Sequence, residues 1–274
     1  MKFCRIGKAG AEVPAVVDQD GAIRSLADAL PDLDATSLPD LRDLRDRVDI
    51  AALPVLDEGR FGPCVAPGGR VLCIGLNYAD HAKESGLPIP EEPVVFMKAC
   101  RPTGPNDDIA IPPGAAKVDW EAELAVVIGR ACYRITEDQV SEHIAGYCIM
   151  NDVSERAYQH ERGGQWVKGK SLPGFAPLGP WLVTADEIDP GSLDVWLEVD
   201  GERYQDGSTA DLIFSVPRII SYLSHFMTLE PGDVISTGTP AGVGAGLSPQ
   251  VFLRAGQTVR LGISELGEQS QNFV

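Results

Sequence analysis

The stretch from residue 118 to residue 129 alternates carboxylates with apolar residues and then becomes wholly apolar. This pattern is typical of a β-strand that enters a buried sheet, because successive side chains of a strand point to opposite faces. Asp119, Glu121 and Glu123 would then share one face of the strand, and the apolar residues between them would cover the other. A chain that contains such a strand must find a partner for three acids on one face.

Buried carboxylates repel one another and are costly unless a cation neutralises them. A second acidic position supports this interpretation, because Asp152 stands where another predicted interior strand, residues 144–150, ends. Ligand sets made only of oxygen favour magnesium, manganese or calcium over zinc, which usually recruits His or Cys. We therefore predict a divalent metal site on Glu121, Glu123 and Asp152. The alternative is a solvated edge strand with ordinary alternating charge.

The composition excludes several classes of partner. Of the 274 residues 44% are hydrophobic, which is sufficient for a globular core, and the formal net charge is −17. An acidic chain of this kind is poorly suited to bind nucleic acid or an anionic membrane. No run of residues approaches a membrane span and the N-terminus has no apolar signal segment, so we expect a cytoplasmic protein. The six cysteines show no CxxC spacing and are expected to be reduced.

A segment rich in proline and glycine, residues 59–69, predicts a junction between two domains. Residues 1–66 form a small accessory domain with strands at 1–6 and 13–17, a short helix at 25–30 and a surface helix at 40–47. Residues 67–274 form the main domain, whose predicted strands outnumber its helices. We expect an α+β protein that is mainly β, with a mixed sheet.

Two positions on a short predicted helix form a candidate catalytic pair. His81 and Glu84 are three residues apart, so their side chains can touch on a helix. A carboxylate that is hydrogen-bonded to an imidazole raises its basicity and fixes its tautomer, as a general base requires. On the spacing alone, a surface ion pair is the alternative. The other three histidines, including His160, are expected to be structural.

Polar residues after Asp152 are candidates for substrate binding. A helix predicted for residues 153–162 places Arg156 and Gln159 on the same side as Asp152. Arg156 either holds a ligand carboxylate in place or binds the carboxylate of the substrate directly. Lys98 ends a predicted strand, where it either protects a sheet edge or supplies a cation near an anionic substrate.

A glycine-rich loop follows the predicted strand at 232–240. It has neither the lysine of a P-loop nor a GxGxxG spacing, which argues against a nucleotide site. Backbone N–H groups in such a loop can instead bind a carboxylate. We therefore expect Gly238 and Thr239 to contact the substrate.

Four motifs in a fixed order, spread over residues 70 to 265, resemble those of the fumarylacetoacetate hydrolase superfamily. They are Gly75-Leu76-Asn77-Tyr78-x-x-His81, Glu121-x-Glu123, Asp152 with Arg156, and Thr237-Gly238-Thr239-Pro240-x-Gly242-Val243-Gly244. Within that superfamily the chain is most similar to bacterial two-domain members that act on 2,4-dioxo acids. The resemblance implies the β-roll of the superfamily's C-terminal domain, a small N-terminal α+β domain and a homodimer.

The resemblance also implies roles for individual residues. His81 and Glu84 match a dyad that activates water, and Lys170 matches a lysine that lies beside the metal and the substrate. The chain departs from the pattern directly after this lysine. Residues 172–174 read Leu-Pro-Gly where close relatives have an acid and a threonine, which puts the substrate or water contacts of that loop in question.

The expected reaction is hydrolysis of the C3–C4 bond of a 2,4-dioxo acid, either an acylpyruvate or a 2,4-dioxo-3-deoxy sugar acid, to pyruvate and a carboxylate. Magnesium is the expected cofactor, with manganese and calcium as alternatives. The same residues would also suit a decarboxylase of the oxaloacetate type, or an isomerase or hydratase of 2-oxo acids. A calcium-stabilised binding module is the non-enzymatic alternative. It would need the acids but not His81, Glu84 or Lys170.

Overall fold

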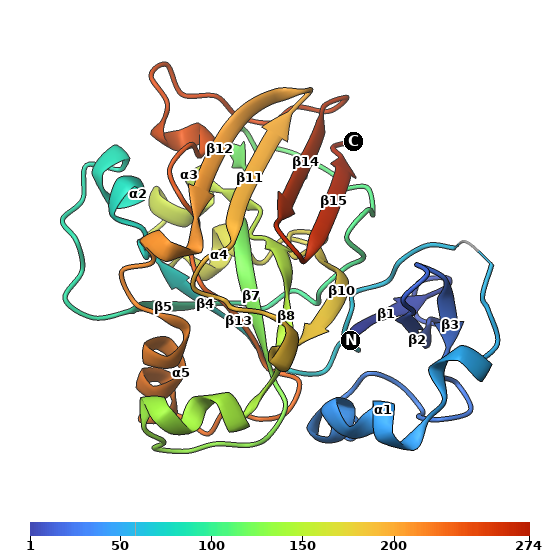
Figure 1. Cartoon of the computed structure of the whole chain (residues 1–274). Coiled ribbons are helices and arrows are strands. Elements are labelled where there is room, and N and C mark those ends of the chain that lie inside the picture. The colour runs from blue at the N-terminus through green and yellow to red at the C-terminus, as the bar shows by residue number, and fades with distance from the viewer. Residues whose placement is uncertain (58) are drawn as a thin grey trace.

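The computed structural model describes residues 1–57 and 59–274 (Figure 1). Within these residues the largest element is a nine-stranded sheet in the order β3-β2-β1-β10-β8-β7-β13-β4-β5. Its strands in chain order are β1 Lys2–Ile6, β2 Val13–Val17, β3 Ile23–Ser25, β4 Val71–Gly75, β5 Val94–Lys98, β7 Ala122–Ile128, β8 Ile144–Asn151, β10 Leu178–Thr184 and β13 Val234–Ser236. The pair β13–β4 is parallel and the other pairs are antiparallel, so the predicted mixed sheet is confirmed.

A second sheet of four strands, in the order β12-β11-β14-β15, packs on the first (Figure 1). Its strands are β11 Asp194–Val199, β12 Glu202–Ser208, β14 Thr258–Ile263 and β15 Gly267–Asn272. Apolar side chains of the two sheets form one buried core, which includes Leu124 and Ile149 from the large sheet and Val195 and Leu261 from the small one. Burial of these side chains is the main force that holds the sheets together.

Helices are short and lie at the ends and edges of the sheets (Figure 1). They are α1 Leu44–Arg47, α2 Ala79–Glu84, α3 Arg156–His160, α4 Val167–Lys170 and α5 Val216–Ser224. Turns of 3-10 helix occupy Leu38–Asp43, Ile50–Ala52, Glu137–Glu142, Ala185–Glu187, Thr209–Asp211 and Gly244–Gly246. The fold class is therefore α+β and mainly β, as predicted. In the described part of the chain, no helix combines the length and apolar character needed to cross a membrane.

The acidic strand predicted for residues 118–129 is interrupted. Val118 and Asp119 form β6, which pairs with β9 (Ser154–Glu155), and β7 begins only at Ala122. Side chains take the backbone N–H groups of the interruption: Asn151 Oδ1 accepts from Glu121 N at 3.2 Å and Gln205 Oε1 accepts from Ala122 N at 2.9 Å. These amides lie far away in the sequence, so alternation alone could not predict the break.

Two predicted helices are shorter in the structure than the sequence indicated. The helix predicted at 153–162 is limited to α3, because Ser154 and Glu155 pair with β6 first and the Glu155 carboxylate then caps Ala157 N at 3.0 Å. The helix predicted at 25–30 is a single turn closed by Leu30 N and Leu26 O at 3.0 Å. The surface helix at 40–47 is present as a 3-10 turn that continues into α1.

The N-terminal residues extend the main sheet. Strand β1 pairs with β10, with Lys2 opposite Val183 and Phe3 opposite Leu182. Figure 1 shows the N-terminal strands in blue beside the main body, with α1 below them. The large sheet thus continues across residue 66, and the division into residues 1–66 and 67–274 stays a prediction.

Asn77 joins three segments that meet beside the site. Its side-chain amide donates to the carbonyls of Phe214 at 3.1 Å and Thr237 at 2.7 Å, and Phe214 N donates to its Oδ1 at 2.8 Å. The side chain is fully buried, so water cannot replace these partners. The residue does not cap α2, whose N-cap is Tyr78.

We expect Asn77→Ala to lower the free energy of unfolding by about 2–4 kcal/mol, because it leaves buried carbonyl and N–H groups without partners. Urea denaturation followed by circular dichroism would measure the change. The matched control is Asn106→Ala, which removes one exposed hydrogen bond to Ser270 N and should cost less than about 1 kcal/mol. Equal stability of the Asn77 variant and the wild type would contradict this account.

Candidate active site

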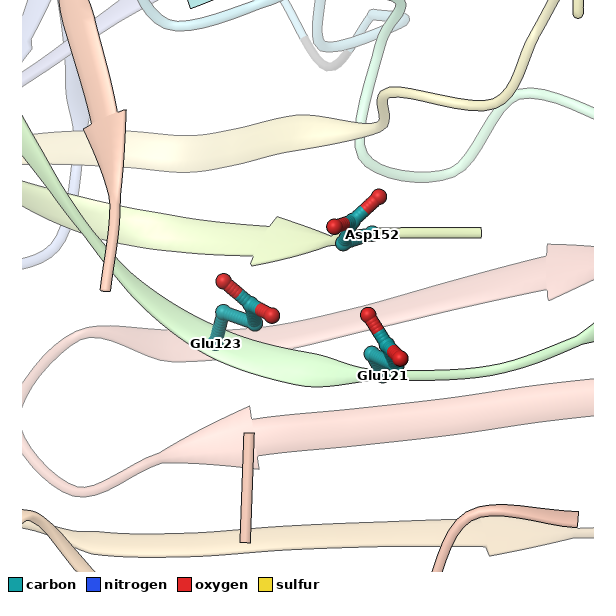
Figure 2. Close-up of side chains that lie close together, drawn as sticks. All are labelled: Glu121, Glu123 and Asp152. Carbon is teal, nitrogen blue, oxygen red and sulfur yellow. The ribbon is translucent and has the colours of Figure 1, made fainter. Parts of the chain in front are cut away.

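Glu121, Glu123 and Asp152 converge at one end of the β7–β8 pair (Figure 2). The antiparallel register places Ala122 opposite Asn151, and Asp152 N donates to Glu121 O at 2.9 Å. This register brings together acids that are about thirty positions apart. One carboxylate oxygen from each of the three buried residues lies within 4.8 Å of the others. The predicted set of oxygen-only donors is therefore assembled in space.

Two lysine side chains form ion pairs with this acidic triad. Lys170 Nζ, at the end of α4, lies 2.5 Å from Glu121 Oε2 and 2.8 Å from Asp152 Oδ2. Lys98 Nζ forms an ion pair with Asp152 Oδ1 and donates to the carbonyl of Val153 at 3.0 Å. Both lysines are almost completely buried. Desolvation lowers the pKa of Lys170, but the charges of Asp152 and Glu121 outweigh it and raise that pKa above its usual value.

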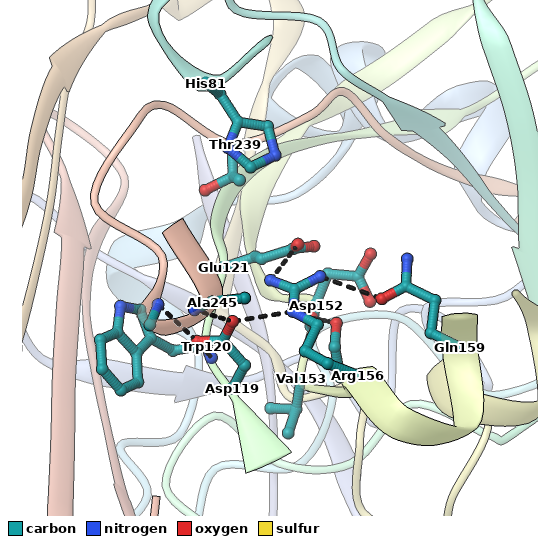
Figure 3. A network of polar contacts seen from close by, with 12 residues as sticks. His81, Asp119, Trp120, Glu121, Asp152, Val153, Arg156, Gln159, Thr239 and Ala245 are labelled. Carbon is teal, nitrogen blue, oxygen red and sulfur yellow. Dashed lines mark hydrogen bonds and ion pairs between the residues drawn. The ribbon is translucent and has the colours of Figure 1, made fainter. Parts of the chain in front are cut away.

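Asp119 belongs to the surrounding network and not to the acidic triad (Figure 3). Its Oδ2 accepts from Arg156 Nε at 2.7 Å, and its Oδ1 accepts from Gly244 N at 2.7 Å. The same guanidinium forms an ion pair with Glu121, with Nη2 and Oε1 2.7 Å apart. Arg156 therefore holds a carboxylate of the triad in place, which was one of the two roles considered for it.

The carboxylates of the triad differ in electrostatic environment. Burial would raise the pKa of Glu121, but the charges of Arg156 and Lys170 outweigh burial and lower it well below its usual range. Burial, followed by repulsion from Asp152 and Glu121, raises the pKa of Glu123 to about 8. The positive charges of Lys98, Arg156 and Lys170 therefore do not fully offset the repulsion of Glu123 by Asp152 and Glu121.

The donor set fits a hard divalent cation. Glu123 Oε2 accepts from Ser236 Oγ at 2.6 Å and from Gly238 N at 2.9 Å. Its Oε1 accepts no hydrogen bond within the described residues. A cation bound there would relieve the repulsion that raises the pKa of Glu123, and oxygen-only donors suit magnesium, manganese or calcium.

His81 and Glu84 are in contact on α2, as the helical spacing predicts. His81 Nδ1 and Glu84 Oε1 are 2.8 Å apart, and Glu84 Oε2 accepts from Gly242 N at 2.9 Å. Because Nδ1 is engaged with the carboxylate, Nε2 is the ring nitrogen left to act toward a ligand. Both side chains are mostly buried, which distinguishes the pair from an ordinary surface ion pair.

The glycine-rich loop binds carboxylates of the protein itself. Its backbone N–H groups were expected to bind a substrate carboxylate, but Gly238 N donates to Glu123, Gly242 N to Glu84, and Gly244 N and Ala245 N to Asp119. The loop therefore connects the acidic triad, the dyad and the Arg156 network. The sequence indicated that the loop binds a carboxylate, but not that the carboxylates belong to the protein itself.

A cavity of about 320 Å³ opens above the acidic triad. Seven predicted site residues line it, and Figure 3 shows five of them converging. They are His81, Glu121, Glu123, Arg156, Gln159, Lys170 and Thr239. His81 of the predicted dyad therefore faces the same cavity as two of the predicted metal ligands, Glu121 and Glu123.

The remaining predicted residues lie behind the cavity wall. Glu84 and Asp152 reach the cavity through their partners His81 and Lys170. Lys98 and Gly238 are not part of the lining in the described chain, and both contact carboxylates of the triad instead. Lys98 ends β5, the outer strand of the large sheet, but its side chain is buried against Asp152 and does not protect an exposed edge. Its role as a cation near the substrate stays a prediction.

Several lining residues were not predicted from the sequence. Phe96, Trp166, His160, Leu76 and Leu87 contribute to the cavity wall. His160 was expected to be structural, yet it is four positions after Arg156 on the same helix, and that spacing was the signal that could have found it. Thr239 lies in the wall, where its hydroxyl donates to Ala122 O at 2.9 Å and accepts from Gln205 Nε2 at 2.7 Å.

The loop that departs from the superfamily pattern lies outside the cavity lining, as far as the described residues show. Leu172 packs against the main core, and Ser171 Oγ accepts from Ala99 N at 2.8 Å. The acid and the threonine of the pattern are replaced by Pro173, which is exposed, and Gly174, which is half-buried.

Comparison with known proteins gives the family. Residues 70–274 match the fumarylacetoacetate (FAA) hydrolase C-terminal family. A provisionally named hydrolase of Burkholderia ambifaria is 55% identical over 277 residues, which cover 99% of this chain and 98% of the relative. The chain belongs to the fumarylacetoacetate hydrolase family, whose members include enzymes.

Two solved structures extend the comparison over the whole chain. Fumarylacetoacetate hydrolase from Exiguobacterium antarcticum has a TM-score of 0.90 at 36% identity and covers 100% of this chain and 99% of its own. Maleylpyruvate hydrolase from Sphingobium sp. SYK-6, solved in complex with manganese(II) ion and pyruvate, has a TM-score of 0.82 at 27% identity with the same coverage. The fold is therefore that of the family, as the motifs predicted.

We expect purified protein to bind one Mg²⁺ or Mn²⁺ ion, and Glu123→Ala to weaken that affinity by at least about tenfold, because the variant removes the donor whose oxygen remains available. Isothermal titration of the chelator-treated protein would measure it. The control Glu142→Ala removes an exposed acid far from the triad and should leave the affinity unchanged. Unaltered binding by the Glu123 variant would show that the ion is held elsewhere.

Proposed function

We propose that the protein is a divalent-metal-dependent hydrolase that cleaves the C3–C4 bond of a 2,4-dioxo acid to pyruvate and a carboxylate. One observation carries the proposal: His81, which is held by Glu84, lines the same cavity as Glu121 and Glu123 of the three-carboxylate cluster. The bound manganese and pyruvate of the maleylpyruvate hydrolase structure support it.

Glu121, Glu123 and Asp152 would hold the metal, with magnesium as the expected ion. When bound, the ion supplies a Lewis acid that withdraws charge from the carboxylate and 2-oxo oxygens of the substrate. The charge of the site agrees with this choice. When all four are ionised, the buried carboxylates Asp119, Glu121, Glu123 and Asp152 and the three buried cations leave one net negative charge. A divalent ion changes this to one positive charge, which suits a single substrate carboxylate.

The dyad would deliver the water. His81 Nε2 takes a proton from water as its oxygen attacks C4, and the C3–C4 electron pair leaves on C3 as the enolate of pyruvate. Glu84 stabilises the resulting imidazolium, and the Gly242 N–H fixes the second oxygen of Glu84. The proton held by His81 is then available to C3, which balances the reaction as pyruvate plus the carboxylate formed at C4.

Residues on the opposite wall would orient the substrate. Gln159 Oε1 accepts from Arg156 Nη1 at 3.1 Å, and since a guanidinium can only donate, the Nε2 of Gln159 must be the group that faces the cavity. That amide can donate to a substrate oxygen. The side chains of Lys170 and Thr239 also line the cavity, where the lysine would stabilise developing enolate charge. We propose Lys170 as the third catalytic residue on this ground.

We expect His81→Ala and Glu84→Gln each to lower kcat for acylpyruvate cleavage roughly a hundredfold or more, the usual range for loss of a general base. Metal affinity should hardly change, because neither side chain belongs to the triad. Steady-state rates beside a calorimetric metal titration would separate the two effects. The control Lys83→Ala alters an exposed residue of the same helix and should keep the wild-type rate.

Other outcomes would redirect the assignment. Parallel losses of rate and metal affinity would place His81 among the metal ligands. Unchanged rates of acylpyruvate cleavage would exclude the dyad as the base of the hydrolysis. Full turnover after exhaustive chelation would overturn the role of the metal.

A further inference from the structure

The cavity has an apolar wall whose purpose the proposed reaction does not explain. Phe96 and Trp166 meet edge to face with ring centroids 5.3 Å apart, and the ring of His160 lies 5.8 Å from that of Trp166. Leu87, from the loop after α2, also lines the cavity. We call the side chains of Phe96, Trp166, His160 and Leu87 the aromatic wall.

The aromatic wall adjoins the reacting end of the cavity. Lys170 Nζ lies 4.9 Å from the centroid of the Phe96 ring, so the ring begins where the ion-pair network ends. Trp166 packs against Gly75, where an added Cβ would come within 2.7 Å of the indole ring. The absence of a side chain at residue 75 therefore leaves room for the indole beside β4. A substrate held at the triad would extend its far end along these rings.

The cavity offers no spare cation for a second substrate carboxylate. In the described chain, Arg156 and Lys170 are its only lysine or arginine lining residues. Arg156 is engaged with Asp119, Glu121 and Gln159, and Lys170 with two carboxylates of the triad. A distal carboxylate would therefore lose its hydration without gaining a partner, inside a protein whose formal net charge is −17.

His160 does not change this balance. Burial, followed by the charges of Arg156 and Lys170, lowers the pKa of its imidazole below the usual value. The ring is therefore neutral near pH 7 and serves as an apolar and weakly polar surface. Its edge-to-face contact with Trp166 is consistent with that role.

We infer that the substrate of this site is a 2,4-dioxo monocarboxylate. The apolar chain attached to its C4 carbonyl is the part that the aromatic wall binds. The inference rests on the proposed function and narrows it. Substrates with a second carboxylate at the far end, and polyhydroxylated sugar acids, would have to bury charged or hydroxyl groups against aromatic rings.

The first test compares two substrates of equal carbon number, 2,4-dioxoheptanoate and 2,4-dioxoheptanedioate, with the magnesium-loaded protein. We expect kcat/KM to be at least about tenfold higher for the monocarboxylate, since an unpaired charge is penalised more than a missing methylene. Equal values, or a preference for the dicarboxylate, would overturn the inference while leaving C–C hydrolysis intact.

Binding provides a readout that is independent of turnover. Titration calorimetry with 4-phenyl-2-oxobutanoate, 2-oxopentanoate and 2-oxopentanedioate should give affinities that decrease in this order. If neither dioxo acid is cleaved but this order holds, the proposed reaction fails and the inferred ligand class stands. If the dicarboxylate binds as tightly as 2-oxopentanoate, the inference fails.

Two variants test the wall itself. Trp166→Ala should lower the affinity for 4-phenyl-2-oxobutanoate about tenfold more than that for 2-oxopentanoate, because only the larger acid reaches the indole. His160→Lys adds a cation and should raise the ratio of dicarboxylate to monocarboxylate affinity by about tenfold. The matched control is Trp196→Ala, which lies on β11 of the small sheet and outside the cavity lining. It should change neither the affinity of 4-phenyl-2-oxobutanoate relative to 2-oxopentanoate nor that of the dicarboxylate relative to the monocarboxylate.

Circular dichroism and thermal unfolding would establish that each variant is folded. If folded Trp166→Ala protein keeps the wild-type ratio, the acyl group lies elsewhere and the aromatic wall is only packing. If His160→Lys does not improve dicarboxylate binding, the far end of the substrate does not reach α3. Either result would overturn the assignment.

Discussion

The burial of opposed charges at the end of β7 and β8 is the constraint on which the site depends. Each carboxylate of the triad is costly alone in a dry interior, and each is held by partners from other segments. Lys98 comes from β5, Arg156 from α3 and Lys170 from α4. The network thereby ties one end of the β7–β8 pair to β5, α3 and α4. Glu121 and Asp152 each contact two cations, so loss of Lys170 would leave each of them with one and would remove the link between them.

The acidic triad was predictable because each of its signals is local. Alternation identifies the face of a strand, and the end of a buried strand identifies Asp152, so a shared site requires only that the two strands pair. The His81–Glu84 contact was predictable for the same reason, since helical spacing alone brings the two side chains together. The chain order of the motifs then indicated the family and its fold.

The remaining features depend on contacts between segments that are distant in the sequence. The break before β7 exists because Asn151 and Gln205 take backbone N–H groups there. Lys98 ends β5, the outer strand of the large sheet, but its buried contact is with Asp152, which is 54 positions away in the sequence. Phe96 and Trp166 meet across an interval of seventy positions. No local periodicity carries such information, so the aromatic wall became visible only in the fold.

The glycine-rich loop separates the enzymatic interpretation from a calcium-stabilised binding module. A structural ion needs only the acids and whatever holds them, which accounts for the Gly238 N–H on Glu123. It does not account for the Gly242 N–H on Glu84, a residue outside the triad. Four positions of backbone thus fix the distance between Glu123 of the acidic triad and the Glu84 carboxylate that contacts His81. A reaction between a polarised substrate and an activated water requires that both be held in a fixed relative geometry. A short loop that contacts both Glu123 and Glu84 provides this.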